Sequence, residues 1–145
     1  MAERSLEQIR WIRLALLAMR RWSLRRFLGL SIGDGVVVSL SAQIICRRRG
    51  TISIGDNSLV AFKTLITTLS ESDPEERPVT IGARCFIGGG AMVGPGVSIG
   101  DDCIIGAGSV VLESIPGGSL VGGNPARIIR SGLTVRRARD EFLFG

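Results

Sequence analysis

A six-residue period of aliphatic side chains constrains the fold of this chain more than any other feature of its sequence. Between residues 81 and 111 an Ile or Val recurs at every sixth position, and a glycine follows each of these residues except the last. The series is Ile81, Ile87, Val93, Ile99, Ile105 and Val111. A helix spaces its apolar residues three and four apart, and a β-sandwich has turns about every 8 to 12 residues, so neither fold explains this period.

A period of six predicts a solenoid of short strands. Each hexad provides one strand and one turn, and three hexads close a triangular coil of 18 residues, with the aliphatic side chain inside. No coil is stable alone, because only stacking buries the core and pairs the backbone between coils. We therefore expect an all-β solenoid, a parallel β-helix of about four coils and a terminal turn.

Two insertions interrupt the repeats. The same six-residue spacing holds in residues 32–44 and 54–66, but Ile44 and Ile54 are ten residues apart, and Ile66 and Ile81 are fifteen apart. The first insertion contains the run Arg47–Arg49. Each insertion predicts a loop extruded from a corner, the second over residues 67–80, and such loops commonly carry function.

The segments on either side of the repeats have a different pattern. Apolar residues at helical spacing alternate with arginines over residues 5–29, which predicts a basic amphipathic helix within an N-terminal segment 1–30. This helix has two compatible interpretations: a cap packed on the solenoid, and a peripheral contact with an anionic membrane surface. The β-helix then occupies residues 31–130, and residues 131–145 form a C-terminal tail or short helix.

The chain contains no histidine, which excludes Ser-His-Asp triads, Cys-His dyads and His-ligated zinc. The three cysteines lack the C-x-x-C spacing of a zinc site or disulfide scaffold, so we expect no metal. Cys85 and Cys103 are 18 residues apart at the same inward position. We expect them to stack in the core as small apolar residues.

Arginine dominates the charge of this chain. The net charge is +5, with 18 basic and 13 acidic residues, and Lys63 is the one lysine. Arginine suits phosphate, carboxylate or anionic membrane contacts, but nucleic acid is not favoured because no aromatic residues are interleaved with the basic runs. No segment reaches the roughly 18 apolar residues of a membrane span. We expect a cytoplasmic protein, with a peripheral position on the inner face of the membrane as an alternative.

The segment PVTIGARCFIGGGAMVGPGVSIGDDCIIGAGSVVLESIPGGSLVGGNPARIIR, residues 78–130, resembles the hexapeptide-repeat acyltransferases. It is most similar to the branch of galactoside, maltose and polysaccharide O-acetyltransferases, and the upstream TISIGDNSLVAF and DPEER fit that branch. The resemblance covers about residues 30–135. It implies a left-handed β-helix, a homotrimer, and acetyl-CoA as co-substrate in the groove between neighbouring β-helices.

The resemblance also implies cofactor-binding residues. Gly89 and Ala107 match the turn positions whose backbone contacts the pantetheine arm of acetyl-CoA. They are 18 residues apart, so we expect them one above the other on adjacent coils. Arg127 and Arg130 match the basic residues near the CoA phosphates, a role that suits the planar fork of a guanidinium group. Simpler interpretations remain open, because Gly89 is also a turn glycine and the two arginines also fit a solvated edge.

The chain departs from the family at the catalytic base. The position of the family's histidine falls at Glu71 when counted from TISIGDN and at Ser70 when counted back from DPEER. The acceptor-binding asparagine of the sugar enzymes falls at Ser41. Leu112-Glu113 replaces a polar or basic pair, and the Glu113 carboxylate would repel a phosphate placed nearby.

Several functions are compatible with these departures. Glu71 or Asp73 could act as the base for a hydroxyl acceptor if burial raised its pKa, whereas a neutral amine acceptor needs only placement beside the thioester. Alternatively, the acidic residues of the second insertion have no catalytic role and simply face the solvent. The leading hypothesis is an acetyl-CoA-dependent acyltransferase acting on a small-molecule or glycan acceptor, a sugar or amino sugar of polysaccharide or envelope biosynthesis. The alternatives are an inactive trimeric scaffold and a subunit that receives its base from a partner chain.

Overall fold

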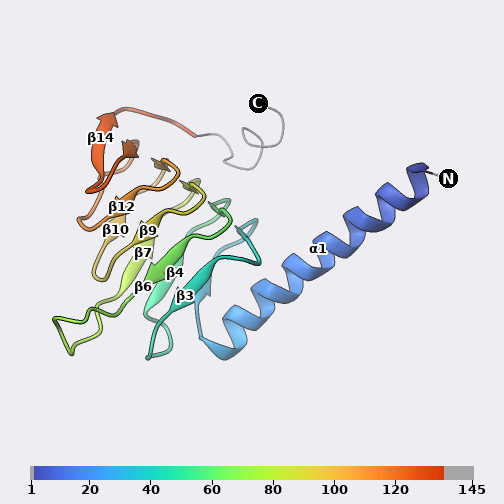
Figure 1. Cartoon of the computed structure of the whole chain (residues 1–145), viewed down its shortest axis with the longest axis horizontal. Helices are drawn as coiled ribbons and strands as arrows, with labels where there is room; N and C mark the ends of the chain where they lie inside the picture. The colour runs from blue at the N-terminus through green and yellow to red at the C-terminus, as the bar shows by residue number, and fades with distance from the viewer. Residues whose placement is uncertain (1, 136–145) are drawn as a thin grey trace.

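The computed structural model describes residues 2–135, which form one long helix followed by a triangular solenoid (Figure 1). The helix is α1 (Ala2–Phe27). The strands are β1 (Ser31–Ile32), β2 (Val37–Val38), β3 (Gln43–Ile45), β4 (Ile52–Ile54), β5 (Leu59–Val60), β6 (Leu65–Thr67), β7 (Val79–Ile81), β8 (Phe86–Ile87), β9 (Met92–Val93), β10 (Ser98–Ile99), β11 (Ile104–Ile105), β12 (Val110–Val111), β13 (Leu120–Gly122) and β14 (Arg127–Arg130). The strands are short because each hexad uses its remaining residues for a corner.

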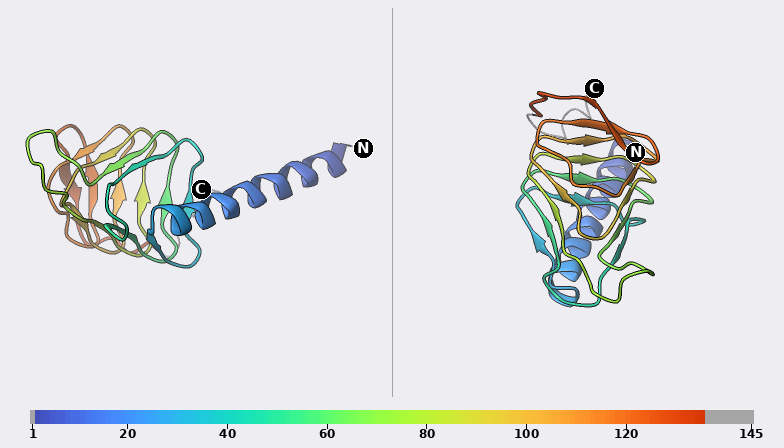
Figure 2. Two further views of the ribbon diagram at one scale, coloured as in Figure 1. Left: turned by 90° about the horizontal axis from the view of Figure 1, so that it is seen from below. Right: turned by 90° about the vertical axis from the view of Figure 1, so that its left-hand side faces the viewer.

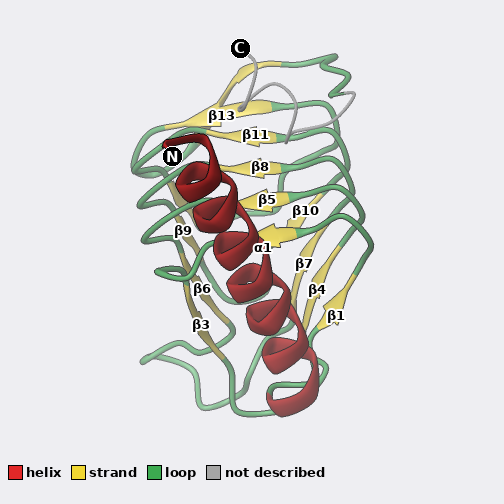
Figure 3. Cartoon of the chain, turned by 90° about the vertical axis from the view of Figure 1, so that its right-hand side faces the viewer, coloured by secondary structure: helices red, strands yellow, loops and turns green. Residues whose placement is uncertain are grey.

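Three sheets form the three faces of the solenoid (Figure 3). We call them face A (β1-β4-β7-β10), face B (β2-β5-β8-β11-β13, with β14 at its edge) and face C (β3-β6-β9-β12). Every pair in these ladders is parallel except β13 with β14. Three consecutive strands make one coil, so four coils are followed by β13, as the hexads predicted.

The core is the column of aliphatic side chains that the six-residue period predicted. The strand register places Ile87 directly between Val60 and Ile105 in neighbouring coils. All three side chains are fully buried. Burial of this kind contributes roughly 1.5 to 3 kcal/mol per large aliphatic side chain, and repeating it in each coil holds the stack together.

Cys85 and Cys103 lie in the same interior, as expected, and both are fully buried. The Cys85 thiol donates to the carbonyl of Gly100 at 3.0 Å, and the Cys103 thiol donates to the carbonyl of Pro116 at 3.2 Å. The hydrogen bond with Cys103 and burial both raise the pKa of the Cys85 thiol. Cys85 is therefore a protonated core residue and no nucleophile.

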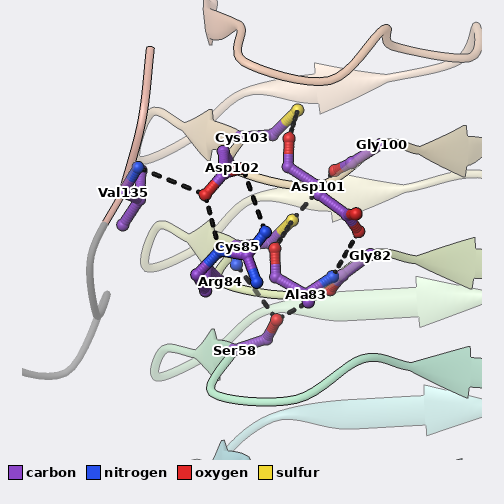
Figure 4. A network of polar contacts seen from close by, with 10 residues as sticks. All are labelled: Ser58, Gly82, Ala83, Arg84, Cys85, Gly100, Asp101, Asp102, Cys103 and Val135. Atoms are coloured by element: carbon purple, nitrogen blue, oxygen red, sulfur yellow. Dashed lines mark hydrogen bonds and ion pairs between the residues drawn. The ribbon is translucent and has the colours of Figure 1, made fainter.

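A polar network joins successive coils at the corner between faces A and B (Figure 4). The Asp102 carboxylate accepts two hydrogen bonds from the Arg84 guanidinium, at 2.8 and 3.1 Å, and a third from the backbone of Val135 at 3.2 Å. The Asp101 carboxylate accepts the backbone N–H of Ala83 at 2.7 Å. These bonds link the third coil to the fourth and hold the C-terminal segment against the coils.

The helix α1 packs on the first coil only through its C-terminal part. Leu24 is buried there, the Arg20 guanidinium donates to the carbonyl of Ala42 at 2.8 Å, and Arg21 lies 3.6 Å from the Asp34 carboxylate. The rest of the helix projects beyond the solenoid (Figure 2). The interpretation as a packed cap therefore holds only for its last turns. Within residues 2–135, no helix combines the length and apolarity needed to cross a membrane.

The C-terminal end of the solenoid differs from the hexad pattern. After the turn at residues 123–126 the chain reverses, and β14 pairs antiparallel with β13 (Figure 1). All four residues of β14 are exposed. The strand covers the backbone edge that the last coil would otherwise leave free. A short helix expected near the C-terminus would fall mainly on residues 136–145, which lie outside the described residues.

The stacked core makes a stability prediction. Replacing Ile105 by Ala removes a fully buried side chain between two coils, and we expect the free energy of unfolding to fall by about 2 to 5 kcal/mol. Ile129→Ala, at a 67% exposed position of β14, should change it by less than about 0.5 kcal/mol. Denaturant unfolding followed by circular dichroism measures both values, and equal effects would contradict the stacked-core interpretation.

Candidate functional site

The corner between faces B and C carries the residues that resemble a cofactor-binding edge. The backbone N–H of Gly90 donates to the carbonyl of Phe62 at 2.9 Å, and that of Gly108 donates to the carbonyl of Gly89 at 3.0 Å. Phe62, Gly89 and Ala107 therefore lie one above another on successive coils. The structure places Gly89 and Ala107 next to each other, as their spacing of 18 residues predicted.

Side-chain size changes abruptly along this corner. Leu40 and Phe62, on the first two coils, are large and more than half exposed, whereas the next two coils present Gly89 and the exposed Ala107. The Phe62 ring lies against Gly89, because a Cβ atom added to Gly89 would stand 2.6 Å from the ring carbon Cζ. The absence of a side chain at Gly89 thus accommodates Phe62, and small side chains leave the backbone of the later coils accessible.

Sequence reasoning missed Phe62. The second insertion adds residues between Phe62 and Gly89, so the two are not 18 residues apart although they lie on neighbouring coils. The 18-residue spacing therefore does not identify Phe62 as the neighbour of Gly89. Ser41 lies at the same corner, one coil earlier, where its Oγ accepts the backbone N–H of Lys63 at 3.1 Å. The position that matches the acceptor-binding asparagine is therefore close to the two large apolar side chains Leu40 and Phe62.

A hollow of about 150 Å³ lies beside the last coil, near Arg127. It is lined by Val111, Leu112, Glu113, Ile115, Pro125, Ala126 and Arg127. The hollow borders the end of β12 and the segment after it, and its lining includes neither Gly89 nor Ala107. Glu113 and Arg127 give it one negative and one positive side chain.

Arg130 does not line this hollow. The pairing of β13 with β14 is irregular, and it places Arg127 opposite Gly122 and Arg130 opposite Leu120. Because alternate residues of a strand share a face, the two arginines belong to the same side of this sheet. The structure brings Arg127 to the hollow and leaves Arg130 away from it.

The extruded loop holds the two candidate bases. Glu71 is exposed, and the half-buried Ser70 has its Oγ 2.9 Å from the Oγ of Ser72. The Asp73 carboxylate accepts the backbone N–H of Glu75 and pairs with the Arg77 guanidinium, and these contacts lower the pKa of Asp73. The suggestion that burial raises the pKa of Asp73 is therefore wrong, because hydrogen bonds stabilise its charged form instead.

Glu76 ties the two inserted loops together. Its carboxylate accepts the hydroxyl of Thr68 at 2.5 Å, the hydroxyl of Thr51 at 3.1 Å, and the backbone N–H groups of Arg47 and Arg48 at 3.0 and 2.8 Å. These hydrogen bonds, that of Thr68 above all, lower the pKa of Glu76. The extruded loop is therefore anchored at its base. No pattern in the sequence distinguishes Glu76 from its acidic neighbours.

The loop and the small-residue corner stand at opposite ends of face C. The second insertion leaves the corner between faces C and A, where the carbonyl of Arg77 accepts the N–H of Gly96 at 3.3 Å. Gly90 and Gly96 mark the two ends of this face, and at about 3.3 Å per residue they are separated by roughly 15 to 20 Å. Within one chain the structure does not bring Glu71 or Ser70 to Gly89.

Comparison with known proteins identifies the family. The model of the bacterial transferase hexapeptide (six repeats) matches residues 78–113. The Bacillus subtilis protein YvoF is 34% identical over 115 residues, covering 78% of this chain and 67% of YvoF. The Escherichia coli colanic acid biosynthesis protein WcaF is 31% identical over 136 residues, covering 76% of this chain and 75% of WcaF. The chain belongs to the hexapeptide-repeat acetyltransferases.

A solved structure of this family confirms the fold. The Vibrio cholerae hexapeptide-repeat acetyltransferase VCA0836, in complex with acetyl coenzyme A, superposes with a TM-score of 0.63 at 32% identity. The match covers 70% of this chain and 60% of VCA0836. The solenoid is thus the left-handed parallel β-helix of the hexapeptide-repeat acetyltransferases, and the chain spans a little under two thirds of this relative's length.

The Glu76 contacts predict how the loop responds to substitution and pH. Glu76→Ala leaves the N–H groups of Arg47 and Arg48 without their acceptor and takes one acceptor from the hydroxyls of Thr51 and Thr68. We therefore expect faster cleavage within residues 68–78 by a protease at neutral pH. The folded-state pKa of Glu76 lies below its usual value of about 4.3. The hydrogen bonds of its carboxylate therefore stabilise the loop fully above that value, and this stabilisation is lost as the pH falls through the lowered pKa.

Limited proteolysis with an acid-stable and a neutral protease, read by mass spectrometry, measures both effects. Glu75→Ala is the matched control, because the Glu75 side chain is exposed on the same loop. Equal cleavage rates in the two variants would contradict the proposed role of the Glu76 hydrogen bonds in holding the loop.

Proposed function

We propose that this chain is an acetyl-CoA-dependent acetyltransferase that acts as a homotrimer on a sugar or amino-sugar acceptor. The observations that carry the proposal are the small-residue turns at Gly89 and Ala107, stacked on successive coils, and the Arg127 hollow on the last coil. In this proposal an extended ligand, with amides along its length and phosphates at one end, lies along the two turns with its phosphates toward Arg127. The VCA0836 complex with acetyl coenzyme A supports the choice of ligand.

These residues have separate roles in this proposal. The small turns at Gly89 and Ala107 make room for the pantetheine arm, and the exposed Ala107 turn offers its backbone to the amides of the arm. Arg127 pairs with a CoA phosphate, where its guanidinium provides charge-assisted hydrogen bonds. Glu113 lines the same hollow, so its carboxylate opposes a phosphate and weakens binding. Arg130, which does not line the hollow, contributes to phosphate binding only if the phosphates extend along β14.

Catalysis has to proceed without an imidazole base. The acceptor attacks the thioester carbonyl, the C–S bond breaks, and CoA leaves as a thiolate that takes up the acceptor's proton. A general base typically accelerates such a step about 100- to 10,000-fold. In a trimer the loop of one chain faces the small-residue corner of the next, so Glu71 or Ser70 meets an acetyl-CoA that a neighbouring chain binds. This arrangement explains why loop and corner are apart within one chain.

The proposed class of acceptor rests on the side chains at the corner between faces B and C and on the names of the relatives. On the first two coils, Leu40 and Phe62 form an exposed apolar surface against which the acceptor would pack, and Ser41 provides a hydroxyl beside it. Apolar surfaces of this kind suit the C–H face of a sugar ring. WcaF is named for colanic acid biosynthesis, which supports a glycan acceptor.

A second candidate function is a trimeric scaffold without catalysis, or a subunit whose base comes from a partner chain. The chain has no histidine, the pKa of Asp73 is lowered, and Glu113 stands beside Arg127. These observations would all follow from a relative that retained the solenoid and lost the chemistry.

Calorimetric titration with acetyl-CoA tests the cofactor site first. We expect micromolar binding, weakened about tenfold or more by Arg127→Ala because a charged hydrogen bond is lost. Gly89→Ala should also weaken binding, since the added Cβ displaces the Phe62 ring. Arg13→Ala, on the distant helix, is the matched control and should bind as the unaltered chain does. No binding at millimolar acetyl-CoA would overturn the transferase proposal for the isolated chain.

Acetyl transfer to hydroxyl and amine sugars tests the loop. If Glu71 is the base, Glu71→Gln lowers kcat with hydroxyl acceptors by about 100-fold or more and leaves the acetyl-CoA Kd unchanged. Transfer to amines should be far less affected. Ser70→Ala tests the other candidate, and Glu75→Gln is the matched control. Unchanged rates in both loop variants would contradict a base on this loop, and bound acetyl-CoA without transfer to any acceptor would favour the scaffold.

A further inference from the structure

The helix α1 exposes an unusual amount of apolar surface for a water-soluble element. Trp11, Trp22, Ile9 and Ile12 are each at least 60% exposed. Further exposed apolar side chains of the helix are Leu6, Leu14, Leu16, Met19 and Phe27. A contiguous apolar patch of this kind marks an interaction surface.

The exposed apolar residues gather on the side of α1 that faces away from the solenoid. At about 100° per residue, one arc of about 160° holds Trp22, Trp11, Met19, Ile12, Leu16, Ile9 and Phe27. We call this arc the apolar face of α1; between residues 6 and 27 its polar members are Gln8, Ser23 and Arg26. The contacts with the first coil come from the other side, through Leu24, Arg20 and Arg21. Among the residues that the structure describes, the contacts of α1 with the first coil therefore leave the apolar face exposed.

Arginines surround this face. Arg10, Arg13, Arg25 and Arg26 are exposed on α1, and Glu7 is the one acidic side chain that the structure describes on the helix. The first inserted loop adds Arg47–Arg49, all exposed.

The inserted arginine loop is fixed at the base of the helix. The Arg49 guanidinium donates to the backbone carbonyl of Arg26 at 2.7 Å, and Glu76 holds the backbone of Arg47 and Arg48. Helix and loop, distant in sequence, thus form one basic end of the molecule, next to the first coil (Figure 3).

We propose that α1 and the Arg47–Arg49 loop form a docking surface for a bilayer that contains anionic phospholipids. The apolar face of α1 lies in the interfacial plane of the membrane, Trp11 and Trp22 sit at headgroup level, and the arginines pair with lipid phosphates. A wide apolar face with tryptophans and flanking arginines is the combination that interfacial helices use. The proposal goes beyond acetyl transfer and does not depend on it.

The width of the apolar face favours a membrane over a partner helix. A coiled coil buries a narrow seam at heptad spacing, which here would be Ile9, Ile12, Leu16 and Met19. It would leave Trp11 and Trp22 exposed on the flank. A bilayer covers both sets of residues, and the positive charge around them complements an anionic surface rather than a second copy of the same basic chain.

Tryptophan fluorescence tests the proposal directly. The chain has two tryptophans, Trp11 and Trp22, so its intrinsic emission reports α1 alone. The full chain is titrated with phosphatidylcholine vesicles that contain or lack phosphatidylglycerol. We expect a blue shift and quenching by brominated lipid with the anionic vesicles only, and weaker binding as NaCl screens the charges. No shift, or equal binding to both vesicle types, would overturn the proposal.

Paired variants separate the charge from the apolar face. Arg47→Ser/Arg48→Ser should reduce vesicle affinity about 25-fold, since each arginine near an anionic surface contributes about fivefold. The backbone bonds to Glu76 remain, and circular dichroism checks the fold. Arg127→Ser/Arg130→Ser removes the same charge at the opposite end of the solenoid and should leave vesicle affinity unchanged (Figure 1). Equal losses in the two variants would contradict the proposed surface.

Ile9→Ser/Ile12→Ser keeps both tryptophans and should abolish the blue shift while the protein remains folded. A blue shift that grows with protein concentration in the absence of vesicles would instead show that α1 binds other copies of the chain. That result, combined with no cosedimentation with anionic vesicles, would overturn the membrane proposal.

Discussion

Stacking of one inward aliphatic side chain per hexad is the interaction on which the whole structure depends. A single coil cannot shield Ile87 from water, but the coils above and below it do so through Val60 and Ile105. The same stacking pairs the backbone of each coil with the next. It also leaves two open ends, and the chain closes them differently: the last turns of α1 pack on the first coil, and β14 pairs with the edge of the last.

The repeats made most of the fold predictable, because the same residue type has the same environment in every coil. The six-residue spacing identified the inward positions, the two loops and the adjacency of Gly89 and Ala107. The antiparallel turn of β14 was not predictable, since RIIR has no hexad pattern and its pairing is set by the free edge of β13. The outward course of α1 was not predictable either, because the pattern indicates an apolar face without indicating what covers it.

The candidate site was predictable only where it follows the repeat. The second insertion breaks the 18-residue spacing between stacked positions. For that reason the repeat did not reveal that Phe62 lies one coil before Gly89. Loop chemistry depends on local contacts, so the sequence did not distinguish Glu76, which joins two loops, from Asp73, which pairs with Arg77. The hollow at Arg127 depends on the reversal of the chain after β13, which the hexad pattern does not indicate.

The regular rise of the coils sets a fixed distance between the two ends of the molecule. Neighbouring parallel strands are about 4.8 Å apart, so the ladder from β2 to β13 raises the Arg127 hollow roughly 20 Å above the coil that carries α1. The number of coils therefore sets the distance between α1 and the Arg127 hollow. Gain or loss of one 18-residue unit would move the hollow by one rung, about 5 Å, while the helix and the hollow themselves stayed as they are.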